Sequence, residues 1–201
     1  MTFKIFSVPV KISFLFPAAI TFLMVTSMKE AALISFVSAF FHELGHLLSI
    51  KKLGGKIKNI EFGAFGGRIT LCGENGLSLK GEIAAAFAGP AVNFVFSAVF
   101  LICFFSTGNK DFFLPLAINL GMGFFNFLPI STLDGGRIFS ALLHMHLSER
   151  ICDIVLNTVS TVFLMIILFL GFLLIMRKGG NFSLLVTCSY LVIFGFVRAA
   201  D

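Results

Sequence analysis

Six long apolar stretches constrain this sequence more than any other feature. A transmembrane helix needs about 20 apolar residues to cross ~30 Å of hydrocarbon, and the first and last stretches need flanking residues to reach that length. Hydrophobic residues make up 58% of the 201-residue chain and charged residues only 12%, so a soluble domain could not bury its apolar surface. We therefore predict an all-α polytopic membrane protein with about six transmembrane helices, at Ile12–Ser27, Ala31–Ile50, Ile83–Ser106, Phe112–Ile130, Ile154–Met176 and Phe182–Val197.

The positive charges predict how the chain is oriented. Six spans place both termini on one side of the membrane, and 11 of the 15 Lys and Arg residues fall on that side. The positive-inside rule then makes both termini cytoplasmic. This asymmetry explains the net charge of +5, and we expect no nucleic-acid partner. The first stretch lacks a small-residue cleavage site and a second span follows at once, so we do not expect a cleaved signal peptide.

The longest connection, from Lys51 to Lys80, separates the second and third apolar stretches. Apolar and polar residues alternate on both sides of Gly66-Gly67, which predicts a short β-hairpin that turns near these glycines. A plain membrane-surface loop is the alternative. We see no repeat, no low-complexity tract and no appended soluble domain, and we expect a single integral-membrane domain over residues 1–201.

A metal-binding pattern, His42-Glu43-Leu44-Gly45-His46, lies in the second apolar stretch. Histidines four apart share one face of a helix and can bind one Zn²⁺ ion, while the glutamate between them can take a proton from a water at the metal. Burying these groups in hydrocarbon is costly unless they are paired or metal-bound. The alternative is a pair of core histidines bonded to the backbone, but that reading leaves Glu43 unexplained.

A catalytic zinc needs a third protein ligand and an open position for water. Of the ten acidic residues, all but Glu43 and Asp134 lie in expected loops, at helix ends or at a terminus. Asp134 lies at the cytoplasmic end of the fourth stretch, at a depth similar to that of His42. Elimination therefore favours Asp134 as the third ligand, and a helix N-cap role is the alternative.

Other candidate ligands are less suited to the site. His144 and His146 are two apart, so a helix would direct them to different faces, and a solvated role at the membrane edge fits their polar surroundings better. The four cysteines are scattered without a CxxC pair, which supports neither a disulfide framework nor a cysteine zinc site.

Three motifs together resemble those of the site-2-type intramembrane zinc metalloproteases, and among them the stage IV sporulation protein FB branch. They cover the second to fourth stretches, about residues 31–140, which form the three-helix catalytic core in that family. Beyond the His42–His46 motif, they are Ala88-Gly89-Pro90-Ala91-Val92-Asn93 and the segment from Asn126 to Gly136, with its Asn-x-x-Pro and Leu-Asp-Gly elements.

The resemblance implies a role for each matching residue. It implies that His42, His46 and Asp134 bind one zinc ion and that Glu43 is the general base. It further implies that Asn126 and Pro129 hold an extended substrate, and that Gly89, Pro90 and Asn93 support the site. A kink at Gly89-Pro90 would open space beside the metal, whereas simple helix packing is the alternative.

The resemblance also carries expectations about biology. It implies a bacterial endospore former, a membrane-tethered substrate such as a sigma-factor precursor, and membrane proteins that inhibit or regulate the protease. The branch often carries a nucleotide-sensing CBS domain, and envelope-stress relatives carry a PDZ domain. We expect neither here, which puts regulation by ATP in doubt.

Three other functions compete with proteolysis inside the membrane. A metal transporter would use the same cluster as its binding site, but transporters tend to be built from repeated halves, which this chain lacks. A non-enzymatic scaffold would have a damaged motif, yet every catalytic residue type is present. A membrane protease with its site outside the lipid conflicts with the position of His42 within an apolar stretch.

Overall fold

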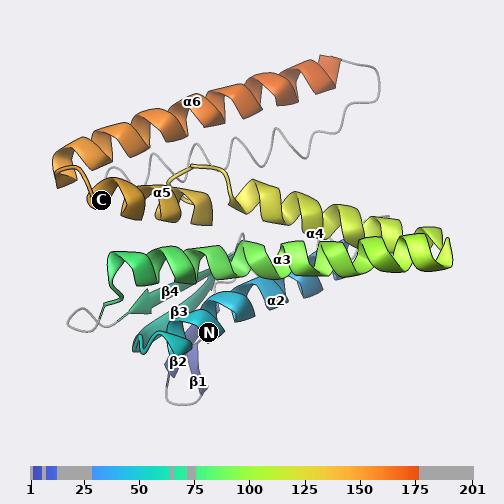
Figure 1. Cartoon of the computed structure of the whole chain (residues 1–201), viewed down its shortest axis with the longest axis horizontal. Helices are drawn as coiled ribbons and strands as arrows, with labels where there is room; N and C mark the ends of the chain where they lie inside the picture. The colour runs from blue at the N-terminus through green and yellow to red at the C-terminus, as the bar shows by residue number, and fades with distance from the viewer. Residues whose placement is uncertain (1, 6–7, 13–28, 64–65, 72–75, 177–201) are drawn as a thin grey trace. The chain divides into compact units, whose positions relative to one another are not determined.

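Two compact units, Met1–Phe125 and Asn126–Asp201, make up the chain. The computed structural model describes residues 2–5, 8–12, 29–63, 66–71 and 76–176, which form four strands, five α-helices and one 3₁₀ turn (Figure 1). The predicted spans Ile12–Ser27 and Phe182–Val197 lie almost wholly outside the described residues.

Helices α2, Lys29–Lys52, and α3, Leu79–Thr107, lie side by side in the first unit (Figure 1). Small residues let the two backbones approach closely. A Cβ atom added at Gly45 of α2 would lie 2.8 Å from the carbonyl oxygen of Ala88 in α3. Close contact of this kind is how helices pack in a membrane, where the hydrophobic effect does not drive them together.

The fourth apolar stretch does not form the single spanning helix predicted at Phe112–Ile130. A 3₁₀ turn, η2, at Lys110–Phe112 leads into α4, which ends at Asn126 after 14 residues. A helix of that length covers only about 21 Å. Pro129 supplies the physical reason, because proline lacks an N–H donor and disfavours helical backbone at the residue before it.

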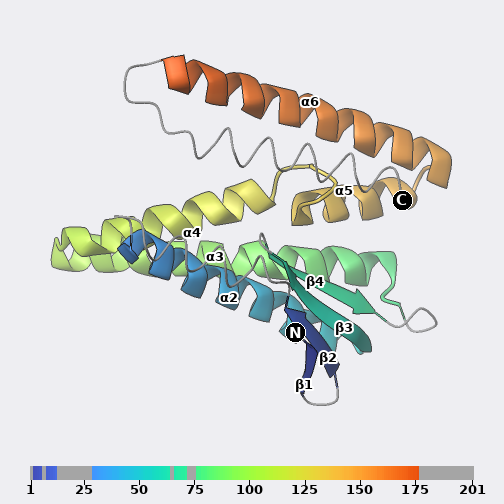
Figure 2. The same cartoon turned by 180° about the vertical axis from the view of Figure 1, so that it is seen from behind.

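A four-stranded sheet completes the first unit, with strands in the order β1-β2-β3-β4 (Figure 2). Strand β3, Ile57–Gly63, pairs antiparallel with β4, Gly66–Leu71, where the sequence predicts a hairpin. Gly66 and Gly67 begin β4, where Gly66 pairs with Gly63 and Gly67 with Phe62. The edges of the described sheet are β1 and β4.

Strands β1, Thr2–Ile5, and β2, Val8–Ile12, correct the all-α prediction for the N-terminal segment. Apolar and polar residues alternate at the strand period through β1 and from Val10 to Ile12 of β2, a signal that is short and easily missed. Strand β2 runs parallel to β3 from Val10 to Ile12. Pro9, which cannot donate to a ladder, therefore lies where β2 pairs only with β1.

The second unit contains α5, Asp134–His144, and α6, Glu149–Met176, which contact each other. The buried Ser160 of α6 ties down the loop before α5. Its hydroxyl accepts from the Ser131 N–H at 2.9 Å and donates to the Pro129 carbonyl at 3.4 Å. Two hydrogen bonds within the second unit therefore fix the loop to α6.

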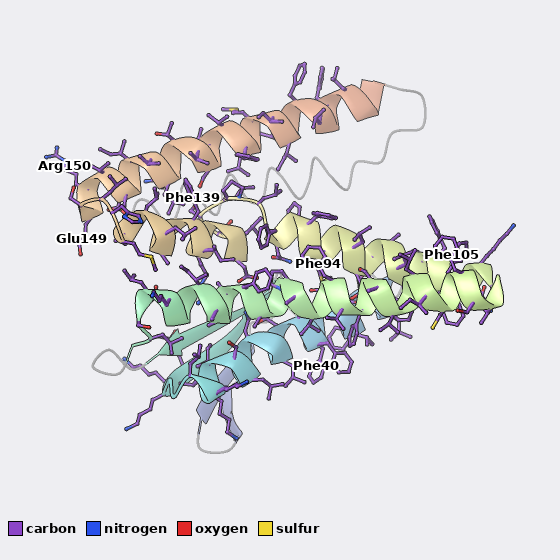
Figure 3. The ribbon with its side chains drawn as sticks, viewed as in Figure 1. Phe40, Phe94, Phe105, Phe139, Glu149 and Arg150 are labelled. Carbon is purple, nitrogen blue, oxygen red and sulfur yellow. The ribbon has the colours of Figure 1, made fainter. Side chains whose placement is uncertain are left out.

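Three of the described helices are long and apolar enough to cross a membrane, namely α2, α3 and the Glu149–Leu173 part of α6. Large apolar side chains project from them (Figure 3), with Phe40 and Phe105 both exposed. Glu149 and Arg150 mark the polar start of α6. Lipid contact explains apolar exposure on this scale, which a soluble protein would not tolerate.

Candidate functional site

His42 and His46 lie one turn apart on α2, in a part of the helix that is packed against α3. The two imidazoles are only 5% and 4% exposed. Their Nε2 atoms are 3.1 Å apart. The helical spacing predicted from the sequence thus brings two ring nitrogens to one point.

Each histidine is oriented by a hydrogen bond from its other ring nitrogen to α3. His46 Nδ1 lies 2.7 Å from the carbonyl oxygen of Ala85, which can only accept, so this Nδ1 carries the proton. His42 Nδ1 lies 2.5 Å from Oδ1 of Asn93, a buried side chain, and donates to it. In neutral imidazoles, the form that binds a metal, both Nε2 atoms then carry lone pairs.

This arrangement fits a zinc ion. Zn–N bonds of about 2.0–2.1 Å at a tetrahedral angle place two nitrogens about 3.3–3.4 Å apart. The observed 3.1 Å separation of the Nε2 atoms is close to that value. Two lone pairs facing each other repel without a cation, whereas a metal-ligating histidine characteristically donates its other N–H to an oxygen acceptor, as both do here.

Gly89 leaves room beside the two imidazoles. A Cβ atom added at Gly89 would overlap His46 Nε2 and lie 2.7 Å from His42 Nε2. The lack of a side chain at Gly89 therefore leaves the space that the two Nε2 atoms occupy. Helix α3 continues through the neighbouring Pro90, so the structure gives this pair of residues a close-packing role at the histidines.

Glu43, the predicted general base, follows His42 on α2 and is half-buried. The adjoining position keeps its carboxylate at the same level along α2 as the imidazole of His42.

Asp134 is buried in the second unit, as the first residue of α5. The N-cap alternative is wrong, because Leu133 is the N-cap residue and no side chain makes a capping bond there. The Oδ1 atom of Asp134 lies 3.7 Å from Nη1 of Arg137, whose side chain is 46% exposed. A carboxylate in the first turn is also favoured by the helix dipole.

Asn126 directly precedes the non-helical loop that leads from α4 to α5, and Pro129 lies within that loop. Asn126 is the last residue of α4 and is half-buried. Two glycines in α5 let the loop fold back on that helix, since a Cβ atom at Gly135 would overlap the Phe127 carbonyl oxygen and one at Gly136 would overlap that of Ile130. The Leu-Asp-Gly-Gly sequence is thus needed for the tight entry into α5.

His144 and His146 have other surroundings. His144 Nδ1 donates to the carbonyl oxygen of Ser140 in its own helix at 2.8 Å, and His146 is exposed. His144 is half-buried and His146 exposed, and the solvated membrane-edge role stays a prediction for both.

Four buried polar residues in apolar helices were not predicted from the sequence, namely Ser38 of α2, Ser97 of α3, Asn119 of α4 and Ser160 of α6. The signal was present, because a polar side chain in a membrane-spanning run is costly and needs partners. None of the four belongs to the three motifs described above.

Comparison with known proteins gives a consistent picture. The model of "Peptidase family M50" matches residues 110–170. A solved structure, the site-2 protease from Methanocaldococcus jannaschii, superposes with a TM-score of 0.71 at 26% sequence identity. That match covers 95% of this chain and 91% of the solved one.

Curated relatives are similar over shorter regions. A zinc metalloprotease of M. jannaschii, MJ0392, is 32% identical over 155 residues, which is 70% of this chain and 44% of the relative. Stage IV sporulation protein FB of Bacillus subtilis is 32% identical over 126 residues, covering 62% and 44% of the two chains. The chain therefore spans less than half the length of these relatives.

Proposed function

The comparisons support membership of peptidase family M50, the site-2 proteases, and on that basis we propose that this chain is an intramembrane zinc metalloprotease. It hydrolyses a peptide bond in a membrane-tethered protein near the cytoplasmic face. The observation that carries the proposal is the His42–His46 pair, whose two lone pairs converge at 3.1 Å on a buried face of α2.

The ligands that we assign to one zinc ion are His42, His46 and Asp134. The two histidines supply neutral imidazoles with fixed tautomers. The carboxylate of Asp134, together with that of Glu43, balances the charge of the ion, so that the low-dielectric site carries no net charge. A three-ligand set leaves one position open, as catalytic zinc sites require.

Replacing Asp134 tests the third ligand. We expect Asp134→Ala to weaken zinc binding by at least about 100-fold, because loss of a direct ligand costs more than loss of a group that orients one. Zinc occupancy of purified protein, measured by mass spectrometry or X-ray fluorescence, gives the answer. Arg137→Gln, which removes the neighbouring cation, serves as the control and should retain zinc. Unchanged zinc occupancy in Asp134→Ala would rule out Asp134 as the third ligand and leave His144 and His146 as the candidates.

Each catalytic step has a residue to perform it. The metal, when bound, supplies polarisation of the scissile carbonyl and a lowered pKa for water. Glu43 takes the proton of the attacking water and delivers it to the leaving amine. Asn126 and Pro129 hold the unwound substrate backbone, because a helical substrate hides its carbonyls in hydrogen bonds.

Strand β4 offers a second contact for that substrate. It lies at an edge of the described sheet, and an extended peptide can add to an edge strand through main-chain hydrogen bonds. The hairpin of β3 and β4 would then align the unwound segment for cleavage.

A deletion tests the role of the hairpin. Removing Phe62–Arg68 should slow cleavage by about tenfold or more, since each lost main-chain hydrogen bond contributes about 0.5–1.5 kcal/mol. Zinc content should stay at the wild-type value, because His42 and His46 lie on α2. Normal turnover of the deletion variant, measured on a tethered substrate, would remove the hairpin from the mechanism.

For the topology, source and substrate of this protein, we take the sporulation branch of the family as the guide. We propose cytoplasmic termini, a bacterial source that forms endospores, and a sigma-factor precursor as substrate under the control of inhibitory membrane proteins. The similarity to stage IV sporulation protein FB supports this choice. Co-expression with a panel of tethered precursors, scored for Glu43-dependent cleavage, tests it. Zinc flux into vesicles that His42→Ala blocks, without cleavage of any precursor, would favour a transporter.

A further inference from the structure

Asn119 lies in the middle of α4, in an apolar helix, with only 1% of its surface exposed. A buried amide costs free energy unless its donors and acceptor are satisfied. Asn93 of α3 is equally buried, at 0% exposure. The two amides are partners, and together they connect α4 to the histidines of α2.

Three hydrogen bonds form this connection within the first unit. Asn119 Nδ2 donates to the carbonyl oxygen of Pro115 at 2.9 Å. Asn93 Nδ2 donates to Asn119 Oδ1 at 3.1 Å and also lies 3.5 Å from Met122 Sδ. His42 Nδ1 then meets Asn93 Oδ1 at 2.5 Å.

The donor and acceptor of each hydrogen bond follow from the Pro115 carbonyl oxygen, which lies at the end of the chain of bonds opposite His42. The Pro115 carbonyl can only accept, so Asn119 must present Nδ2 to it and Oδ1 to Asn93. Asn93 must then present Nδ2 to Asn119, which leaves its Oδ1 facing His42. An acceptor at this position requires the proton of His42 on Nδ1, and the lone pair on Nε2.

We propose that Asn119 is a positioning residue that fixes the tautomer of His42 through Asn93. It touches neither metal nor substrate, and it acts by orienting the Asn93 amide. The proposal deepens the proposed function on which it rests, because a neutral His42 with its lone pair on Nε2 is the form that binds zinc. The competing explanation is that Asn119 merely packs α4 against α3.

Two measurements on purified protein test the proposal. In metal-free protein, ¹⁵N spectra of labelled imidazoles report which ring nitrogen is protonated, and only four histidines need assignment. We expect the Nδ1–H form for His42 in the wild type and a mixture of tautomers in Asn119→Leu. Chelator competition should show that Asn119→Leu weakens zinc binding by about 10–100-fold, the usual cost of losing a group that orients a ligand.

Two further variants separate positioning from packing. Asn119→Asp keeps an oxygen that accepts from Asn93 and should restore zinc affinity to within about tenfold of wild type. Ser97→Ala removes another buried polar side chain, one that donates to the Asn93 backbone carbonyl at 3.0 Å rather than to its amide. It should leave both the His42 tautomer and zinc affinity unchanged.

Several results would overturn the proposal. They are a wild-type His42 without the Nδ1–H form, wild-type zinc affinity in a folded Asn119→Leu variant, or an equal loss of affinity in Asn119→Leu and Ser97→Ala. If Asn119→Leu does not fold, a wild-type His42 without the Nδ1–H form still overturns the proposal, and the comparison of Asn119→Asp with Ser97→Ala still tests it. If the wild-type protein binds no zinc, the proposed function fails, while the tautomer measurement on metal-free protein still tests the role of Asn119.

Discussion

Glu43→Gln is expected to bind zinc as the wild type does and to cleave a tethered substrate about 10²–10⁴-fold more slowly, the usual contribution of a general base. Glutamine has nearly the same shape as glutamate but cannot accept a proton from water. Because His42 is hydrogen-bonded to Asn93 and His46 to the carbonyl oxygen of Ala85, the metal ligands should stay in place. The measurement is single-turnover cleavage in detergent or liposomes, alongside zinc content.

A matched control exists in the same helix. Glu30→Gln makes the same chemical change in the first turn of α2, where the side chain is exposed. It should cleave at the wild-type rate. Wild-type cleavage by a zinc-loaded Glu43→Gln would show that another residue moves the proton, whereas loss of zinc would show that Glu43 holds the site together.

Gly89→Ala is expected to weaken zinc binding by more than about 100-fold, although it adds a single methyl group. The new Cβ would overlap His46 Nε2 and lie 2.7 Å from His42 Nε2. Moving away from this Cβ atom would break the hydrogen bond of His46 to Ala85 or that of His42 to Asn93. Chelator competition on purified protein measures the loss.

Two other glycines separate this clash from general effects of alanine. Gly121 of α4 has open space around it, so Gly121→Ala should keep zinc affinity and stabilise the helix by about 0.5–1 kcal/mol. A Cβ atom at Gly45 would press on the Ala88 carbonyl instead of the imidazoles. Gly45→Ala should therefore cost less zinc affinity than Gly89→Ala. Wild-type zinc affinity in Gly89→Ala would contradict the claim that the space at Gly89 is needed for the two imidazoles.

The histidine pair was predictable because its geometry is local. Helical periodicity alone brings His42 and His46 to one face, and their cost in hydrocarbon identifies them as functional. The same reasoning places helices close to the bounds found for α2, α3 and α6. Local patterns determine all these features.

Features that depend on contacts between distant segments were not predictable in the same way. The orientation of His42 requires Asn93, 51 residues away, and Asn93 in turn requires Asn119. Hydropathy also missed the end of α4 at Asn126, since the apolar run continues past it to Ile130. Strands β1 and β2 are too short for their alternation to outweigh the apolar run that follows.

Reconstitution with zinc tests the central claim most directly. Protein stripped by a chelator should not cleave a tethered substrate, and titration with zinc should restore cleavage up to about one equivalent per chain, the stoichiometry of a single catalytic site. A His42→Ala/His46→Ala variant should not respond. Full cleavage by stripped protein, or equal restoration in the double variant, would contradict a zinc protease built on this pair.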